Sequence, residues 1–153
     1  MDLIFWRHAE AEDERDGQSD LERELTARGQ KQAARMAAWL DRHLPEGTRI
    51  LCSPAVRCEQ TVLALGRKYK LRHELQPGAA PAELLELTQW PRAKHPVMIV
   101  GHQPALGETL AQLLCIEGGD STIRKGAVWW LRTREREQGD QTLVWAVVCP
   151  EVA

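Results

Sequence analysis

Residues 3–9 read LIFWRHA, an apolar run that ends at once in an arginine and a histidine. A short apolar run of this kind predicts a buried β-strand. Residues that directly follow such a strand in an α/β protein lie at the carboxyl end of the sheet, where ligands bind. Arg7 and His8 therefore predict a functional site, because a guanidinium binds phosphate or carboxylate and an imidazole can act as base, metal ligand or nucleophile.

Two further apolar runs end in the same way. Residues 50–57 read ILCSPAVR, and residues 97–102 read VMIVGH. If the three runs are neighbouring parallel strands, their carboxyl ends meet on one rim of the sheet. This placement gathers five polar side chains as candidate site residues: Arg7, His8, Ser53, Arg57 and His102.

The whole chain alternates predicted strands and helices, which is typical of an α/β fold with a mostly parallel sheet and helices on both faces. The last two strands flank a polar turn and predict an antiparallel hairpin at one edge of the sheet. The predicted strands are residues 3–6, 49–52, 71–75, 97–100, 127–132 and 142–148, and the predicted helices are residues 26–44, 54–69, 81–89 and 104–114.

Capping residues mark the starts of two of these helices. Thr26 is the predicted N-cap of the first helix. Ser53, which stands before Pro54, is the predicted N-cap of the second helix, with the proline at the first helical position. The apolar side chains that we expect to face the core from this second helix are Val56, Leu63 and Leu65.

Length and composition bound the possible functions. The 153 residues predict a single domain, residues 1–153. A net charge of −2 gives no reason to expect nucleic acid or an anionic membrane as a partner. No segment approaches the roughly 20 apolar residues that span a bilayer, and no signal peptide is expected. The four cysteines lack CxxC spacing and no export signal is expected, so we expect reduced thiols and a cytoplasmic location. The oligomeric state is open, and a monomer is favoured.

The candidate residues suit phosphoryl chemistry. Arg7 and Arg57 would form a cationic pocket, and planar guanidinium groups match a tetrahedral oxyanion such as phosphate. We expect no metal and no cofactor, because two guanidiniums repel a divalent ion and no carboxylate or cysteine completes a ligand set with the histidines. His8 is the predicted nucleophile through a neutral ring nitrogen, and a protonated His102 would add positive charge.

Four sequence blocks carry a resemblance to a known family: RHAEA at residues 7–11, LTARG at 25–29, SPAVRCEQT at 53–61 and VGHQP at 100–104. Taken in this order, they resemble the histidine phosphatase (phosphoglycerate mutase-like) superfamily. The short chain and the RHA form most resemble its SixA-type phosphohistidine phosphatases. This resemblance implies His8 as the phospho-accepting nucleophile, with Arg7, Arg57 and His102 as phosphate ligands, and hydrolysis without a metal.

The spacing between two blocks bears on the substrate. Only 44 residues lie between Arg57 and His102. Larger members of the family place an insertion there that covers the site and supplies a carboxylic general acid. We therefore expect an open site that accepts a protein side chain. A phosphohistidine leaves as imidazole, which needs less protonation than a departing alkoxide, so the predicted reaction is dephosphorylation of phosphohistidine in a protein.

Two alternatives remain open. One is a small-molecule phosphomonoesterase in which Glu83 or another carboxylate is the acid, although Glu83 is better explained as a first-turn helix residue that the helix dipole favours. The other is a phosphoprotein-binding module with little turnover. A further hypothesis concerns residues 10–24, which hold eight acidic residues and two arginines. This segment is either a solvated loop or an acidic rim that steers a basic protein surface towards the site.

Overall fold

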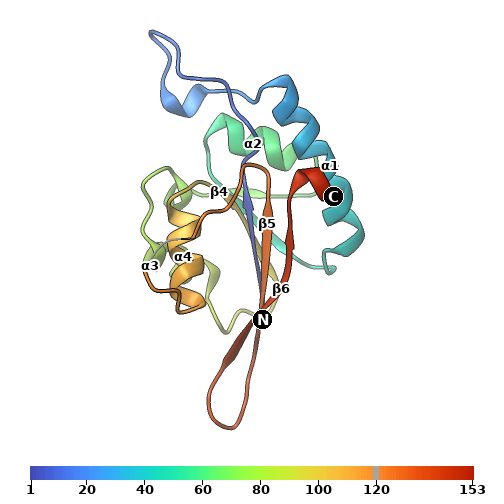
Figure 1. Cartoon of the computed structure of the whole chain (residues 1–153), viewed down its shortest axis with the longest axis vertical. Coiled ribbons are helices and arrows are strands. Elements are labelled where there is room, and N and C mark those ends of the chain that lie inside the picture. Colours follow the sequence, from blue (N-terminus) through green and yellow to red (C-terminus); the bar gives the residue numbers. More distant parts are fainter. Residues whose placement is uncertain (119–120) are drawn as a thin grey trace.

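A computed structural model describes residues 1–118 and 121–153 of the chain. Its strands form one six-stranded sheet in the order β3-β2-β4-β1-β5-β6 (Figure 1). The strands are β1 (Asp2–Arg7), β2 (Arg49–Cys52), β3 (Lys70–Leu71), β4 (Val97–Gly101), β5 (Val128–Arg134) and β6 (Gln141–Val148). The α-helices of the described residues are α1 (Ala27–His43), α2 (Val56–Leu63), α3 (Pro81–Thr88) and α4 (Ala105–Leu113).

The strand directions confirm the predicted fold class. Strands β3, β2, β4 and β1 are all parallel to one another. Strand β5 pairs antiparallel with β1, and β6 pairs antiparallel with β5. The C-terminal hairpin is therefore the antiparallel edge of a mostly parallel sheet. Strand β6 lies at that edge and β3 at the opposite one. The prediction of a single domain over residues 1–153 remains a prediction.

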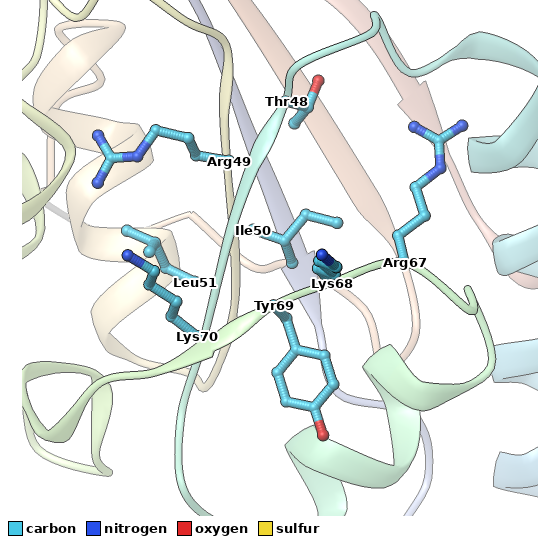
Figure 2. A pocket seen from close by; sticks show the side chains of 8 residues that line it. All are labelled: Thr48, Arg49, Ile50, Leu51, Arg67, Lys68, Tyr69 and Lys70. Carbon is cyan, nitrogen blue, oxygen red and sulfur yellow. The ribbon is translucent and has the colours of Figure 1, made fainter.

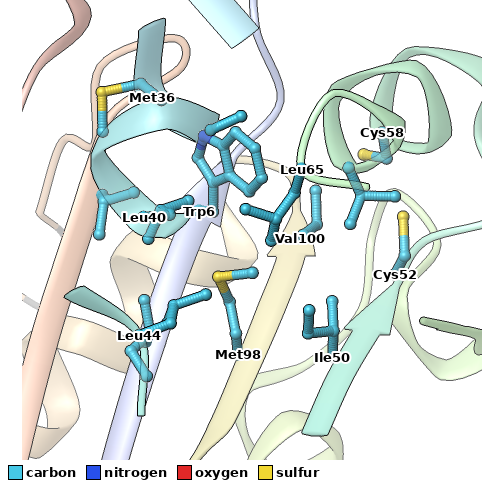
Figure 3. Close-up of a cluster of buried hydrophobic side chains, with 14 of the residues drawn as sticks. Trp6, Met36, Leu40, Leu44, Ile50, Cys52, Cys58, Leu65, Met98 and Val100 are labelled. Atoms are coloured by element: carbon cyan, nitrogen blue, oxygen red, sulfur yellow. The ribbon is translucent and has the colours of Figure 1, made fainter. Parts of the chain in front are cut away.

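The apolar run of β1 is buried on both faces of the sheet. Ile4 and Trp6 face one core cluster, and Leu3 and Phe5 face a second one, because side chains alternate along a strand. Helices α1 and α2 cover the first cluster (Figure 3), and α3 and α4 cover the second. Burial of each large apolar side chain contributes about 1.5–3 kcal/mol to stability, so this run anchors the sheet.

Helix α1 begins where the sequence predicts and packs against the segment that follows β1. The hydroxyl of Thr26 accepts a hydrogen bond from the Gly29 N–H at 2.9 Å, which confirms Thr26 as the N-cap. A Cβ atom at position 29 would clash with the carbonyl oxygen of Glu10. Glycine at this position therefore lets the helix approach the chain directly after His8.

Helix α2 differs from its prediction. It begins at Val56 with Ala55 as N-cap, so the prediction of Ser53 as N-cap was wrong. The Ser53 hydroxyl accepts from the Ala55 N–H at 3.3 Å and also bonds to His102 at 2.7 Å. The helix ends at Leu63, whose side chain is 57 % exposed rather than buried. The residues that α2 buries are Arg57, Cys58, Thr61 and Val62.

The region after α2 is less regular than expected. The predicted strand over residues 71–75 is the two-residue strand β3, followed by a 3-10 turn, His73–Leu75. In this turn only Leu75 is buried. Within the described residues, no helix is long and apolar enough to cross a bilayer.

Candidate active site

The carboxyl ends of three adjacent parallel strands bring the predicted site residues together. Arg7 at the end of β1 pairs in register with Gly101 of β4, and Cys52 of β2 pairs with Val100. The backbone ladder continues one residue further, because the His8 N–H donates to the Gly101 carbonyl at 3.1 Å. His8 and His102 thus follow neighbouring strands, and their ring centroids lie 5.3 Å apart.

A cavity of about 230 Å³ opens at these strand ends. Four predicted residues line it, whereas Ser53 does not. The described lining residues are Arg7, His8, Ala11, Asp13, Arg23, Arg57, Pro77, His102, Gln103 and Lys125. Arginine and lysine supply four of these ten side chains, so the cavity is a cationic pocket.

The contacts of His8 select one tautomer of its ring. Its Nδ1 lies 2.7 Å from the carbonyl oxygen of Ala9. A carbonyl oxygen only accepts hydrogen bonds, so Nδ1 carries the proton in the neutral ring. The Nε2 atom is therefore left with a free lone pair. The Ala9 N–H, in turn, donates to the Thr61 hydroxyl at 3.1 Å, which ties the segment after β1 to helix α2.

The surroundings of His8 keep it uncharged. Its side chain is 7 % exposed, and burial lowers the pKa of His8 to about 4. The hydrogen bond to Ala9 acts in the opposite direction, while the positive charges of Arg57, Arg7 and Arg23 lower the pKa further. At neutral pH the ring is neutral, which is the state that can attack phosphorus.

His102 is also buried, at 4 % exposure, and its ring contacts Ser53 and Cys58. Its Nε2 lies 2.7 Å from the Ser53 hydroxyl and 3.4 Å from the Cys58 sulfur. Burial lowers the pKa of His102 to about 3, with a further contribution from His8 and Arg57. Desolvation and the neighbouring cations thus disfavour a protonated His102 in the free site.

The two predicted arginines both line the cavity with the histidines. Arg57 lies in the first turn of α2, as predicted, and is 3 % exposed. Arg7 donates from Nη1 to the carbonyl oxygen of Ile123 at 2.7 Å. The Nε atoms of both arginines are buried and have no hydrogen-bond partner among the described residues. Unpaired buried donors are rare in proteins, so these two nitrogens mark both arginines as candidate anion ligands.

Ser53 and Glu83 lie outside the cavity lining. Ser53 is fully buried beneath His102 and lies outside the described cavity lining, which favours a positioning role over direct substrate binding. The hydroxyl positions the imidazole instead. Glu83 accepts a hydrogen bond from the Ala80 N–H at 2.9 Å at the start of α3. This contact supports its interpretation as a helix-capping residue rather than as an acid in the site.

Sequence reasoning missed several lining residues. Arg23 and Asp13 come from the acidic segment 10–24, and Lys125 comes from the chain before β5. Nothing in the local pattern of charges distinguishes them from solvated loop residues. Gln103 follows His102 directly, but its side-chain oxygen accepts from the Gly107 N–H at 2.8 Å and its amide donates to Ser121. Gln103 therefore connects the first turn of α4 to the chain at Ser121, before β5.

A larger hollow of about 500 Å³ lies elsewhere, between β2 and the segment before β3 (Figure 2). The guanidinium groups of Arg49 and Arg67 point away from each other there, and no histidine, cysteine or carboxylate is among its described lining residues. It therefore lacks the paired histidines and arginines that meet at the strand ends. No three His, Cys, Asp or Glu side chains of residues 1–118 and 121–153 converge as ligands for a metal ion.

Comparisons with known proteins agree with this geometry. The family model of the histidine phosphatase superfamily (branch 1) matches residues 3–80. The chain is 33 % identical over 129 residues to a phosphohistidine phosphatase SixA homolog of Haemophilus influenzae, covering 74 % of this chain and 77 % of that protein. It is also 33 % identical over 123 residues to phosphohistidine phosphatase SixA of Escherichia coli, covering 74 % of each chain.

Solved structures extend the similarity over nearly the whole chain. A SixA structure from Nakamurella multipartitia superposes with a TM-score of 0.79 at 28 % identity, covering 97 % of this chain and 95 % of that one. The structure of the protein histidine phosphatase SixA in complex with tungstate superposes with a TM-score of 0.75 at 27 % identity, covering 98 % and 97 %. The chain therefore belongs to the histidine phosphatase superfamily, branch 1, and is a phosphatase similar to the SixA proteins.

Proposed function

We propose that this phosphatase dephosphorylates phosphohistidine in a protein substrate, through a covalent intermediate on His8 and without a metal ion. One observation carries the proposal. The hydrogen bond from Nδ1 of His8 to the Ala9 carbonyl leaves a neutral Nε2 lone pair in a pocket of arginines. A neutral nucleophile beside fixed cations suits attack on a phosphoryl group, whose negative charge the arginines stabilise.

The reaction then runs in two displacements. Nε2 of His8 attacks phosphorus, the bond from phosphorus to the substrate nitrogen breaks, and the departing imidazole takes a proton from water. Arg7 and Arg57 bind the equatorial oxygens of the transferring group, and His102 lines the same pocket. Water next attacks phosphorus, the phosphorus–Nε2 bond breaks, and inorganic phosphate leaves. His8 returns to its neutral form.

The state of the histidines supports phosphohistidine over a phosphate ester. Both His8 and His102 are neutral at neutral pH, so neither ring offers a proton to a leaving group in the free enzyme. An alkoxide needs such a proton far more than imidazole does. Asp13 is the carboxylate in the described cavity lining, and it stands at the exposed mouth. A phosphomonoesterase would therefore depend on Asp13 rather than on Glu83.

Three further observations support phosphate binding, chemistry without a metal and a cytoplasmic location. The tungstate bound by the related SixA structure is a tetrahedral oxyanion, like the transferring phosphoryl group. The absence of a converging ligand set in the described residues supports chemistry without a metal. Free thiols at Cys52, Cys58, Cys115 and Cys149 agree with the predicted cytoplasmic location.

The decisive experiment compares hydrolysis of a phosphohistidine-bearing protein with hydrolysis of an aryl phosphate, in EDTA, for wild type and His8→Ala. We expect the wild-type protein to prefer phosphohistidine and His8→Ala to lose turnover by about 10³-fold or more, because the nucleophile is gone. The exposed residue His95, changed to alanine, is the matched control and should keep wild-type rates. Ester hydrolysis that matches phosphohistidine hydrolysis and is lost in Asp13→Asn would favour the phosphomonoesterase, and phosphate binding without turnover would favour the binding module.

A further inference from the structure

The acidic segment 10–24 is fixed against the site rather than free in solvent. The Glu12 N–H donates to the Glu24 carbonyl at 2.8 Å, and Ala11 forms a β-bridge with Leu25. The Leu25 N–H also donates to the side-chain oxygen of Gln60 on α2 at 2.7 Å. These contacts close the segment into a defined loop, so its side chains have fixed places near the cavity.

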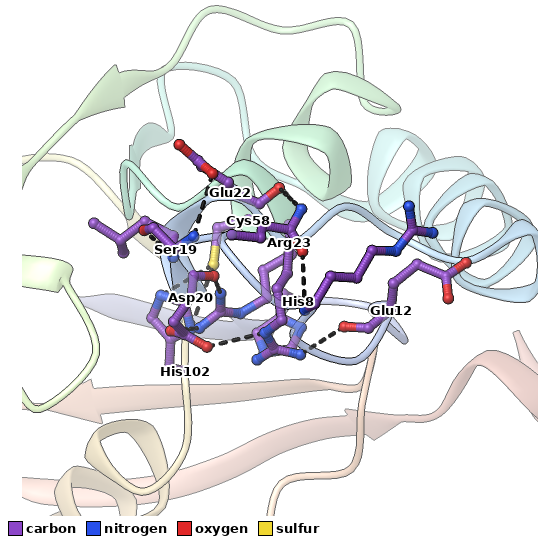
Figure 4. Close-up of polar contacts among 12 residues, drawn as sticks. His8, Glu12, Ser19, Asp20, Glu22, Arg23, Cys58 and His102 are labelled. Carbon is purple, nitrogen blue, oxygen red and sulfur yellow. Dashed lines mark hydrogen bonds and ion pairs between the residues drawn. The ribbon is translucent and has the colours of Figure 1, made fainter.

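Asp20 is the residue of this loop that reaches the predicted phosphate ligands (Figure 4). Its carbonyl oxygen accepts from Nη1 of Arg57 at 2.7 Å, and its carboxylate oxygen Oδ2 accepts from Nη2 at 3.1 Å. Its other carboxylate oxygen, Oδ1, accepts from Nε of Arg23 at 2.9 Å. One aspartate thus connects two arginines that come from different parts of the chain.

The edge of Arg57 that Asp20 occupies is the one formed by its two terminal nitrogens. The Nε atom of Arg57 has no partner among the described residues. A guanidinium can bind one oxyanion along its terminal edge and another along its Nε side, because its five N–H donors are arranged as a planar fork. Asp20 therefore holds Arg57 in place through its two terminal nitrogens.

Arg23 is held at the cavity mouth by the same network. Besides its bond to Asp20, it donates from Nη1 to the Glu12 carbonyl at 2.9 Å. Its side chain lines the cavity and is 22 % exposed. Its positive charge lowers the pKa of His8, which places it within electrostatic reach of the proposed nucleophile. The remaining nitrogen, Nη2, has no partner among the described residues.

We propose that Arg23 is an additional phosphate-binding residue and that Asp20 is the positioning residue that holds Arg23 and Arg57 for this role. The proposal rests on the proposed function only in taking this cavity as the phosphate site. The phosphoryl group would then meet three arginines, Arg7 and Arg57 from within the fold and Arg23 from the loop. Asp20 itself touches no substrate.

Two physical effects predict opposite results for Asp20→Asn. Removal of a negative charge beside an anion site strengthens anion binding by electrostatics alone. Loss of the carboxylate that orients two arginines weakens it, since charge-assisted hydrogen bonds require fixed donor geometry. Weaker phosphate binding in Asp20→Asn therefore indicates a positioning role, and stronger binding indicates that Asp20 acts only as a neighbouring charge.

The test is calorimetric titration of the full chain with inorganic phosphate, alongside circular dichroism to confirm folding. We expect Asp20→Asn to weaken phosphate binding about tenfold and Arg23→Gln to weaken it about tenfold or more. Arg23→Lys should recover part of this loss, because it keeps the charge but not the fork. The double variant should lose less than the product of the two single losses, since both act through one network.

Matched controls come from the same loop. Glu14→Gln removes another carboxylate and Arg15→Gln another arginine, and both side chains are exposed and lie outside the described cavity lining. Neither should weaken phosphate binding by more than about twofold. Tighter binding by Asp20→Asn, or unchanged binding by Arg23→Gln, would overturn the proposal. Because phosphate binding needs no turnover, these outcomes are independent of whether phosphohistidine is the substrate.

Discussion

The two walls of the cavity are held in different ways. One wall consists of strand ends, where His8 and His102 are nearly fully buried and where the His8 N–H continues the backbone ladder between β1 and β4. The other wall is the loop of residues 10–24, where Asp20 and Arg23 are partly exposed and held by ion pairs. Arg57 joins the two, because it is buried in α2 and bound to Asp20.

This difference separates chemistry from recognition. A nucleophile needs a fixed position and a fixed tautomer, and buried backbone contacts supply both. A loop held by partly exposed side chains can change its sequence with less effect on the core, so it can adapt to a substrate surface. Substitutions in the strand-end wall should therefore affect turnover, whereas substitutions in the loop should affect mainly affinity.

After loss of the His8 nucleophile, the largest effect is expected at Arg57, the residue that joins both walls. Arg57→Gln should lower kcat/KM by about 10²–10³-fold, because it removes a guanidinium that stabilises the transferring phosphoryl group. Steady-state kinetics with the phosphorylated protein measures this. Arg67→Gln is the control, since Arg67 is a partly exposed arginine paired with Asp41 and should leave kcat/KM unchanged. A loss of less than threefold in Arg57→Gln would show that this arginine does not contact the reacting group.

The next effect concerns stability in the strand-end wall. Burial lowers the pKa of His8 to about 4 and of His102 to about 3, from an ordinary value of 6.5. Above pH 6.5 neither the folded nor the unfolded chain protonates these rings, so they cause no pH dependence there. Between pH 6.5 and about 4 the unfolded chain binds protons and the folded chain does not. As the pH is lowered through this range, the free energy of unfolding should thus fall by up to about 1.4 kcal/mol per pH unit for each histidine.

Urea unfolding between pH 6.5 and 5 measures this slope. His8→Asn should reduce the slope by about half of the histidine contribution, because one of the two buried rings no longer titrates. His95→Asn, at an exposed position, should leave it unchanged. Equal slopes in wild type and His8→Asn would mean that His8 titrates alike in the folded and unfolded chains.

A smaller effect is expected behind the site. Ser53→Ala removes the hydroxyl that lies 2.7 Å from Nε2 of His102. We expect about a tenfold loss of kcat and about 1–2 kcal/mol of stability, because the buried imidazole loses its hydrogen bond. Ser53→Thr, which keeps the hydroxyl, tests whether the bond rather than the volume matters. Unchanged kcat in Ser53→Ala would show that His102 needs no such support.

The smallest effect is expected in the loop wall. Glu12→Gln, Asp13→Asn and Asp16→Asn combined remove three exposed carboxylates near the cavity mouth. If the acidic rim steers a basic protein surface, kcat/KM for the protein substrate should fall about threefold at low salt and approach the wild-type value at high salt. An unchanged salt dependence would show that the loop does not steer the substrate.

Local sequence patterns predicted most of the architecture. The apolar runs at residues 3–6 and 97–100 are buried strands, and Thr26 caps α1, because burial and capping depend on residues near one another in sequence. The pattern overestimated α2, which spans Val56–Leu63, and it missed the hydrogen bond between Ser53 and His102. A contact between residues 49 positions apart leaves no trace in the local sequence.

By itself, the sequence determined the strands, the mostly parallel sheet and the presence of Arg7, His8, Arg57 and His102 in a pattern that resembles a phosphatase family. Only the tertiary structure decided the tautomer of His8 and the network that joins Asp20 to Arg23 and Arg57. The reason is physical. Hydrophobic periodicity is a local property of the chain, whereas the protonation of a ring and the partner of a guanidinium depend on burial and on groups that folding brings from distant positions.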